Sequence, residues 1–213
     1  MELPGTGGWG GFRPGAGRKV EDRRNGPVHV RREEHQARHP VHVTLRARET
    51  VPSLRSLRVF SKVKRALGAA QRARFRVIHF SVQSDHIHLI VEGDTPVALT
   101  RGLQGLAIRC AFAVNRATGR RGPVWRHRYH AHELRTPTET RRAMAYVLLN
   151  YCKHLNAVRG VDPRSSGVWF EHWAHDFEPS DWPRLVAAPQ TWLASVGWAL
   201  VGGPLHLREG PRP

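Results

Sequence analysis

The sequence has few cysteines, no signal-like start and no long apolar segment. Its two cysteines, Cys110 and Cys152, lack C-x-x-C spacing and lie in apolar helical patterns, so we exclude a disulfide framework and expect reduced core residues. The first residues contain no apolar core of a signal peptide, and no uninterrupted apolar run reaches about 18 residues. These absences predict a cytoplasmic protein with one main domain and no membrane partner.

Acidic residues are also scarce. The chain has 17 Asp and Glu but 34 Lys and Arg, which gives a formal net charge of +17. Lysine occurs only at positions 19, 62, 64 and 153, so most of the positive charge is arginine, whose planar fork suits phosphates and guanine edges. Because such an excess attracts polyanions, we expect nucleic acid, and association with the nucleoid, ahead of an anionic membrane surface. An arginine-rich proteome would also contribute to this composition.

Composition divides the chain into an arm, a main domain and an extension. Residues 1–40 are rich in Gly, Pro and Arg and cannot form a core. They are either a basic arm that touches DNA phosphates or a minor groove, or a plain disordered tail. Residues 41–160 hold the periodic segments, and residues 161–213 are rich in Trp and Pro. The DNA-binding candidates of the arm are Arg13, Arg18 and Lys19.

Hydrophobic periodicity in the main domain predicts alternating strands and helices. In order, these are a strand at 41–45, a helix at 53–70 with Ser53 as N-cap, strands at 74–82 and 86–92, a helix at 96–117 closed by Gly119, an extended segment at 124–134, and a helix at 138–158 with Thr138 as N-cap. This order predicts an α+β, ferredoxin-like (split β-α-β) fold. In that topology the first and third strands are central, two helices cover one face, and the remaining helix follows the last strand.

His86 and His88 stand two residues apart in the third predicted strand, in Asp85-His86-Ile87-His88-Leu89-Ile90-Val91. Residues at i and i+2 of a strand point to the same face, so we expect both imidazoles on the face that the two helices leave open. Imidazole binds many transition metals and can help to hold a hard cation beside a phosphate. The alternative is a strand with two half-buried histidines.

Tyr146 and Asn150 share one face of the last predicted helix, because they are four residues apart in an apolar segment. A carboxamide oxygen is a modest ligand for hard cations. A tyrosine can be a covalent nucleophile when its phenolate is stabilised. The alternative for Tyr146 is amphipathic packing with the hydroxyl at the rim.

Together these features resemble the single-tyrosine HUH transposases, and in particular their REP-associated tyrosine transposase branch. The likeness rests on His-hydrophobic-His at 86–88, on Tyr-x-x-x-Asn at 146–150, and on the segment between them. That segment reads Gly122-Pro123-Val124-Trp125-Arg126-His127-Arg128-Tyr129-His130 and is similar to the branch's Gly-x-x-Trp-x-x-Arg-Tyr. The resemblance runs from about residue 41 to residue 158 and implies that the main domain is the catalytic domain.

The resemblance implies an enzyme that cleaves and rejoins single-stranded DNA, with hairpins in its substrate, through a 5′-phosphotyrosine. His86, His88 and Asn150 align with the protein ligands of a divalent metal, Mg²⁺ or Mn²⁺. Tyr146 aligns with the nucleophile. Because the tyrosine helix of relatives acts either within one chain or across a dimer, both a monomer and a homodimer are compatible with the sequence.

Three residues between the motifs are further DNA-binding candidates. Arg126 and Arg128 are expected to stabilise the phenolate or to clamp the strand. Trp125 is expected to stack on an unpaired base, and its alternative is a core tryptophan.

The chain also departs from the family's pattern after the tyrosine. Relatives often continue with Asn-Pro, whereas Asn150 is followed here by Tyr151. His154 lies one turn further along the same helical stripe and is a possible accessory ligand or phosphate contact.

Two other functions fit parts of the sequence. One is a catalytically silent DNA-binding regulator on the same fold. The other is an RNA-binding module of the RRM type, which shares the β-α-β-β-α-β order but needs exposed aromatics on its central strands. A zinc hydrolase fits less well, because no carboxylate-rich or cysteine-rich ligand set is present.

Overall fold

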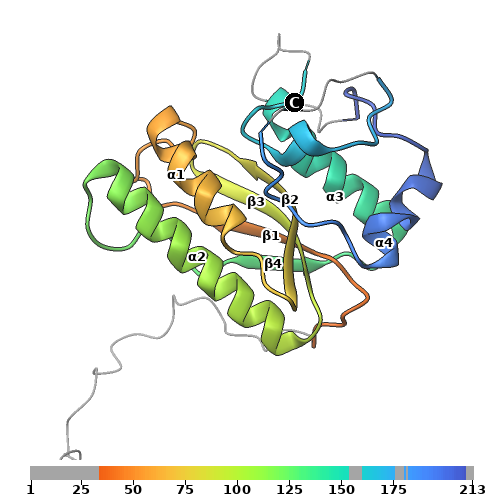
Figure 1. The fold of residues 1–213 in the computed structure, drawn as a ribbon, viewed down its shortest axis with the longest axis horizontal. Helices are drawn as coiled ribbons and strands as arrows, with labels where there is room; N and C mark the ends of the chain where they lie inside the picture. The colour runs from red at the N-terminus through yellow and green to blue at the C-terminus, as the bar shows by residue number, and fades with distance from the viewer. Residues whose placement is uncertain (1–33, 154–159, 176–179, 181, 210–213) are drawn as a thin grey trace, which may run out of the picture. The chain divides into compact units, whose positions relative to one another are not determined.

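A computed structural model describes residues 34–153, 160–175, 180 and 182–209, which are built around one four-stranded sheet (Figure 1). All neighbouring strands are antiparallel, in the order β2-β3-β1-β4. β1 and β3 are therefore central, as the ferredoxin-like prediction requires. The strands are β1 (Val41–Arg46), β2 (Phe75–Val82), β3 (His86–Gly93) and β4 (His130–Glu133).

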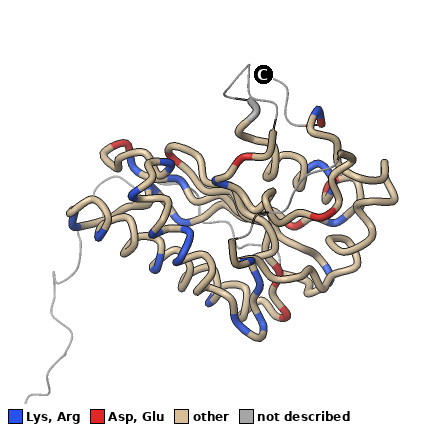
Figure 2. The backbone as a smooth tube through the Cα atoms, turned by 45° about the horizontal axis from the view of Figure 1, so that its top comes forward, with Lys and Arg blue, Asp and Glu red and all other residues tan. Residues whose placement is uncertain are grey.

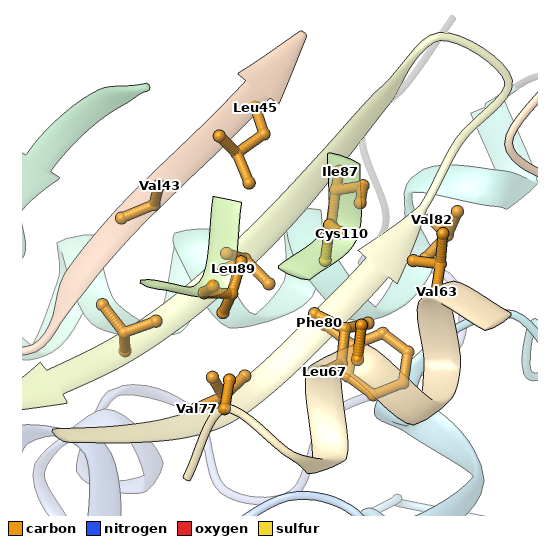
Figure 3. Close-up of a cluster of buried hydrophobic side chains, with 14 of the residues drawn as sticks. Val43, Leu45, Val63, Leu67, Val77, Phe80, Val82, Ile87, Leu89 and Cys110 are labelled. Carbon is orange, nitrogen blue, oxygen red and sulfur yellow. The ribbon is translucent and has the colours of Figure 1, made fainter. Parts of the chain in front are cut away.

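Apolar side chains on one face of this sheet form the main core with two helices (Figure 3). Val43, Leu45, Ile87 and Leu89 alternate with polar residues along the two central strands and are all at most 2 % exposed. Because side chains of a strand alternate between faces, this pattern leaves the polar residues of β1 and β3 on the other face. Figure 1 shows α1 and α2 on the apolar face and α3 on the opposite face.

α1 (Leu57–Gly68) begins later than the predicted cap at Ser53. The Ser53 hydroxyl instead accepts a hydrogen bond from the backbone N–H of Arg55, in a turn that precedes the helix. The apolar spacing of Leu54, Leu57, Phe60, Val63 and Leu67 predicts one buried helical stripe, but Leu57 is 77 % exposed, whereas Leu54 is fully buried from the turn. The prediction was wrong because Leu54 lies before the first residue of the helix. Helical spacing therefore does not relate the direction of its side chain to that of Leu57.

α2 (Pro96–Thr118) has the predicted start and end. The chain leaves it through Gly119, whose φ of 68° lies in the left-handed region that favours glycine. Among the described residues, α2 is the one helix that is long and apolar enough to cross a membrane, although we predicted no such segment. Its stripe of Leu99, Leu103, Leu106, Cys110 and Val114 is buried against the sheet and α1, whereas 28 % of the apolar window as a whole is buried.

α3 (Pro137–Leu149) begins at a capping box that differs from the predicted one. Thr136, not Thr138, is the N-cap: its hydroxyl accepts a hydrogen bond from the Glu139 backbone N–H at 3.2 Å, and the Glu139 carboxylate accepts one from the Thr136 N–H. The predicted end was also wrong. The α-helix stops at Leu149 and continues as a 3₁₀ helix, η2 (Asn150–Lys153).

The C-terminal extension packs against α3. Its short elements are η3 (Ser166–Trp169), α4 (Trp192–Ser195) and η4 (Gly197–Val201). Trp173, Trp198 and Leu205 join the apolar side of α3 in a second buried cluster. Arg141 of α3 holds the C-terminal extension against this helix, because its guanidinium donates to the Gly203 carbonyl at 2.6 Å and to the Glu209 carboxylate at 2.7 Å. The extension thus holds in place the helix that carries Tyr146.

Candidate active site

His86 and His88 lie on the face of the sheet that α1 and α2 leave open, as predicted. Ile87, Leu89 and Val91 alternate with them and are fully buried on the other face. The two imidazole rings have centroids 4.5 Å apart and are nearly perpendicular. The strand therefore presents two adjacent ring systems to the layer formed by α3.

The central partner strand fixes the orientation of His88. Thr44 of β1 is directly opposite His88, and its hydroxyl lies 3.2 Å from His88 Nδ1. His42 Nε2 lies 3.3 Å from the same nitrogen. Because both contacts engage Nδ1, the second ring nitrogen, Nε2, remains buried with no hydrogen-bond partner among the described residues.

His86 is oriented in the same way by a carboxylate. Its Nδ1 lies 2.6 Å from Asp85 Oδ1, and Arg46 is 3.3 Å from the other oxygen of Asp85. A metal-binding histidine commonly engages a carboxylate or another hydrogen-bonding group through the nitrogen that does not face the metal. Both histidines thus have Nδ1 occupied and Nε2 as the remaining ligand atom.

Burial keeps His88 and His42 neutral. Desolvation, aided by the charges of neighbouring histidines, lowers the pKa of His88 to about 3 and that of His42 to about 4. Near pH 7 these rings are therefore uncharged and keep a lone pair, the form in which imidazole binds a metal.

Tyr146 of α3 reaches this cluster within one chain. Its ring centroid is 4.9 Å from that of His88 and 5.8 Å from that of His42, with both pairs edge-on. The side chain is half-buried. A phenol and two imidazoles that the sequence separates by more than fifty residues thus come together, and no second copy of the chain is needed to supply the tyrosine.

Asn150 lies one turn after Tyr146, where α3 changes into the 3₁₀ helix. It is only 2 % exposed, and its Nδ2 has no hydrogen-bond partner among the described residues. Since the two ends of a carboxamide are interchanged by rotation, that position can equally be taken by the oxygen. Its joint coordination with the two histidines stays a prediction.

These residues fit a divalent metal by chemistry. Within the described ranges, no group of three or more His, Cys, Asp or Glu is placed to hold a metal ion. The predicted ligands here are two imidazoles and a carboxamide, and asparagine is not among those residue types. Four buried polar side-chain atoms of the described residues lack a hydrogen-bond partner, and two of them belong to His88 and Asn150. Buried polar atoms are rarely left unpaired, so each of these two atoms is open to a further partner.

An open pocket of about 420 Å³ adjoins Tyr146. It lies between α3 and the C-terminal extension, with Ala145 and Val201 as apolar wall. Its lining residues are Thr138, Arg141, Arg142, Ala145, Tyr146, Val201 and Glu209. Arg141 is held by Glu209, whereas Arg142 is exposed. The pocket therefore combines apolar surface with an available cation beside the phenol.

The three DNA-binding candidates between the motifs lie elsewhere. Trp125 is half-buried against the main core and donates its indole N–H to the Ala107 carbonyl of α2 at 2.8 Å, which is the position of a core tryptophan. Arg126 and Arg128 are exposed. The Arg126 backbone N–H donates to the Arg46 carbonyl at the His86 end of the sheet. The roles of all three in DNA binding stay predictions.

Four predicted residues lie outside the described ranges. They are Arg13, Arg18 and Lys19 of the N-terminal arm and the accessory candidate His154.

Sequence reasoning missed the residues that surround the histidine pair. His42 and Thr44 occupy alternate positions of the first central strand, and Asp85 immediately precedes the pair. His132 of β4 is opposite His42, with His130 two residues before it. The signal was present: histidines at i and i+2 in a second extended segment, and polar residues alternating along a central strand.

The RNA-binding alternative lacks its main requirement. β1 and β3 contain no Phe, Tyr or Trp on either face, so the central strands offer no aromatic platform for bases.

Comparison with known proteins agrees with this geometry. Residues 37–148, more than half of the chain, match the family described as "Transposase IS200 like", a range that includes His86, His88 and Tyr146. Transposases of this family generally use a divalent metal. None of the curated proteins compared with the chain matches it.

A solved structure of a REP-associated tyrosine transposase bound to a REP hairpin is similar to the chain. The TM-score is 0.55 at 18 % identity, over 77 % of this chain and 100 % of that one. At this identity the likeness concerns the fold, an α+β sheet with the same layers. From the family match, the fold and the phenol–imidazole cluster, we conclude that the chain belongs to the IS200-like transposase family and is a DNA transposase.

Proposed function

We propose that the chain cleaves and rejoins single-stranded DNA through a covalent bond between Tyr146 and a 5′ phosphate. The observation that carries this proposal is the contact of the Tyr146 ring with His88, 4.9 Å between centroids, beside the unpartnered Nε2 of His88. The phenol thus lies next to the one histidine, among the described residues, that has a buried ring nitrogen without a partner.

The chemical step is a transesterification. The Tyr146 oxygen forms a bond to phosphorus and loses its proton, while the bond from phosphorus to the 3′ oxygen breaks and that oxygen gains a proton. The phosphodiester energy is kept in the phosphotyrosine, so a 3′-hydroxyl can reverse the step and join strands without a nucleotide cofactor.

His86, His88 and Asn150 would hold Mg²⁺ or Mn²⁺ on this face. When bound, the ion supplies Lewis-acid polarisation of the scissile phosphate and lowers the cost of the phenolate, whose free pKa is near 10. Asp85, His42 and Thr44 position the two imidazoles for this role by engaging their Nδ1 atoms.

The pocket beside Tyr146 would seat the nucleotide next to the scissile phosphate. Its size is in the usual range for small-ligand sites. Ala145 and Val201 offer an apolar wall to a base, and Arg142 offers a charge to a phosphate. Arg126 and Arg128 would hold the strand further along the sheet, near the His86 end.

The substrate would contain a hairpin, since the structurally similar transposase is described as bound to one. The enzyme would act in the nucleoid of the cytoplasm. The contact of Tyr146 with His88 in one chain supports cleavage within a monomer, and a homodimer would not need to exchange this helix. The basic arm of residues 1–40 would add nonspecific contacts through Arg13, Arg18 and Lys19.

The test is a covalent adduct. The full-length protein is incubated with Mn²⁺ and labelled single-stranded DNA that contains hairpins, and adducts are resolved under denaturing conditions. We expect an adduct with the natural chain and with Tyr151→Phe, a matched loss of one phenol hydroxyl, but none with Tyr146→Phe. DNA binding without any adduct would instead support the silent regulator, and an adduct that persists in Tyr146→Phe would contradict the assignment of the nucleophile.

A further inference from the structure

The helix layer on the other side of the sheet is entirely without acidic residues. α1 and α2 contain no Asp or Glu, but they carry seven Lys and Arg residues. Figure 2 shows these cations distributed along both helices. This face therefore has a strong positive field, although it is remote from the layer that holds Tyr146.

Four arginines of this region line one groove. The groove has a volume of about 360 Å³ and lies between α2 and the start of β2. Arg101 and Arg109 come from α2, and Arg72 and Arg74 come from the connection between α1 and β2. We call this feature the arginine groove.

The arginine groove is not neutralised within the protein. In the part of the chain that the structure describes, no ion pair engages Arg74, Arg101 or Arg109. Arg72 donates only to neutral carbonyls, those of Ala69 and Gln71. The carboxylate nearest in sequence to the groove residues on α2, Asp94, is held by Arg76 at 2.6 Å. Four adjacent cations without a carboxylate repel one another, and an anionic ligand would remove that repulsion.

The shape of the groove suits a phosphate backbone rather than bases. Gly102 and Gly105 also line it, and the Phe75 ring fills the space that a Gly102 side chain would occupy. Its one aromatic residue, Phe75, is 1 % exposed and packs against Gly102. Proteins that hold unpaired strands usually stack bases on exposed aromatic rings, and the arginine groove has no such ring.

The spacing of the arginines matches a regular strand. Arg101 and Arg109 are eight residues apart on α2, which is about 12 Å along a helix axis. Along a duplex whose axis runs parallel to α2, with roughly 3.4 Å of rise for each phosphate of one strand, this distance covers about three phosphates. Arg72 and Arg74 form the opposite side of the same groove.

We propose that the arginine groove binds the sugar–phosphate backbone of a base-paired DNA segment, on the opposite face of the sheet from Tyr146. This inference rests on the proposed function only in taking DNA as the substrate. The two faces of the sheet then bind different parts of the DNA. The face covered by α1 and α2 binds the backbone of paired DNA, and the face covered by α3 binds the unpaired strand that is cut.

The test compares two double variants of the full-length protein. Arg101→Ala/Arg109→Ala removes two groove cations, and Arg58→Ala/Arg65→Ala removes two exposed cations of α1 that do not line the groove. Binding is measured by fluorescence anisotropy, over a range of salt, with a DNA hairpin that carries a single-stranded tail and with the tail alone. Melting curves confirm that each variant is folded.

We expect the groove variant to bind the hairpin roughly tenfold more weakly, with a salt slope smaller by about two, because about one counterion is released for each phosphate contact. The α1 variant and the tail-only probe should change far less. Equal losses in both variants, equal losses for both probes, or no loss would overturn the proposal. Adduct formation on saturating tail-only DNA should be unchanged in the groove variant. If the natural chain forms no adduct at all, the proposed function fails, whereas the binding comparison still decides the role of the groove.

Discussion

The two faces of the sheet are formed by the same strands but have different roles. On β3, Ile87, Leu89 and Val91 point to α1 and α2 and are fully buried among apolar neighbours. On its other face, the same strand presents His86, His88, Ile90 and Glu92 to α3 and the C-terminal extension. The first face is a scaffold whose residues need only shape and apolarity. The second face mixes apolar packing with polar groups that need specific partners.

The polar groups of the second face differ along the strand. Near its end, Glu92 is fully buried and satisfied, since it pairs with Arg76 and accepts bonds from the backbone of Gln190 and from Thr191. Near its start, His88 keeps a buried nitrogen without a partner, close to Tyr146. Glu92 binds the C-terminal extension to the sheet, whereas the Nε2 atom of His88 remains available to a substrate or an ion. An unpaired buried polar atom lowers the stability of the fold. The presence of such an atom on His88 is therefore consistent with a functional role for this residue.

The largest expected effect is on the scaffold face. Leu89→Ala removes a fully buried side chain from the main core and should lower the free energy of unfolding by about 3 kcal/mol, within the usual range of roughly 2–5. Urea denaturation measures this. The adduct yield per folded molecule should stay near that of the natural chain, and a selective loss of chemistry in a stable Leu89→Ala protein would break the comparison.

The neighbouring residue should show the opposite pattern. His88→Phe keeps a ring but removes both nitrogens, and we expect the rate of adduct formation to fall about 100-fold, or roughly 2.7 kcal/mol in barrier. The free energy of unfolding should change by less than about 1 kcal/mol, because the lost Nδ1 contacts are offset by removal of the unpaired Nε2. A variant that unfolds but retains its rate per folded molecule would show that His88 is only structural.

Acid should destabilise the fold through a buried histidine outside the site. Burial, aided by the charges of Arg184 and His172, lowers the pKa of His79 from 6.5 to about 3. Between these values the unfolded chain binds a proton that the folded chain does not, so this stability is complete above pH 6.5 and is lost as the pH falls. At pH 5 the loss is about 2 kcal/mol.

Unfolding measured from pH 8 to pH 5 tests this directly. His79→Gln should flatten the pH dependence by about 2 kcal/mol, whereas the exposed control His127→Gln should not. An unchanged pH dependence in His79→Gln would contradict the assignment.

The smallest expected effect concerns the start of the nucleophile helix. Thr136→Ala removes the N-cap of α3 and should cost about 1 kcal/mol of stability. Thr138→Ala, which removes the cap that the sequence first suggested, should cost much less. Thermal unfolding compares the two, and a larger loss in Thr138→Ala would contradict the capping box seen here.

Sequence periodicity predicted the sheet order and the placement of both histidines, because strand alternation and the split β-α-β order determine which residues share a face. It failed at the start of α1 and at both ends of α3, although it gave both ends of α2. The apolar stripe of α3 runs on past Leu149, and periodicity alone does not show that the backbone tightens into a 3₁₀ turn at Asn150. Thr136 and Thr138 both precede helix-compatible residues, and they are distinguished by Pro137 directly after Thr136 and by Glu139 three residues after it.

The alternating polar residues of β1 were visible in the sequence, but their partners in the site depend on tertiary contacts. His42 and Thr44 become part of it through strand register, which places them beside His88. The support of α3 by Trp198 and Arg141 depends on how the C-terminal extension packs. No local pattern in the Trp-rich tail indicates that contact.

The central claim is that Tyr146 is the residue that DNA becomes attached to. The adduct formed with Mn²⁺ and a hairpin-containing single strand can be digested with nuclease and trypsin, and the modified peptide fragmented in a mass spectrometer. Cleavage after Arg142 and Lys153 gives one peptide that contains both Tyr146 and Tyr151, so fragmentation must separate the two. We predict a nucleotide phosphate on Tyr146 alone. A nucleotide phosphate on Tyr151 or on any other residue would contradict the account.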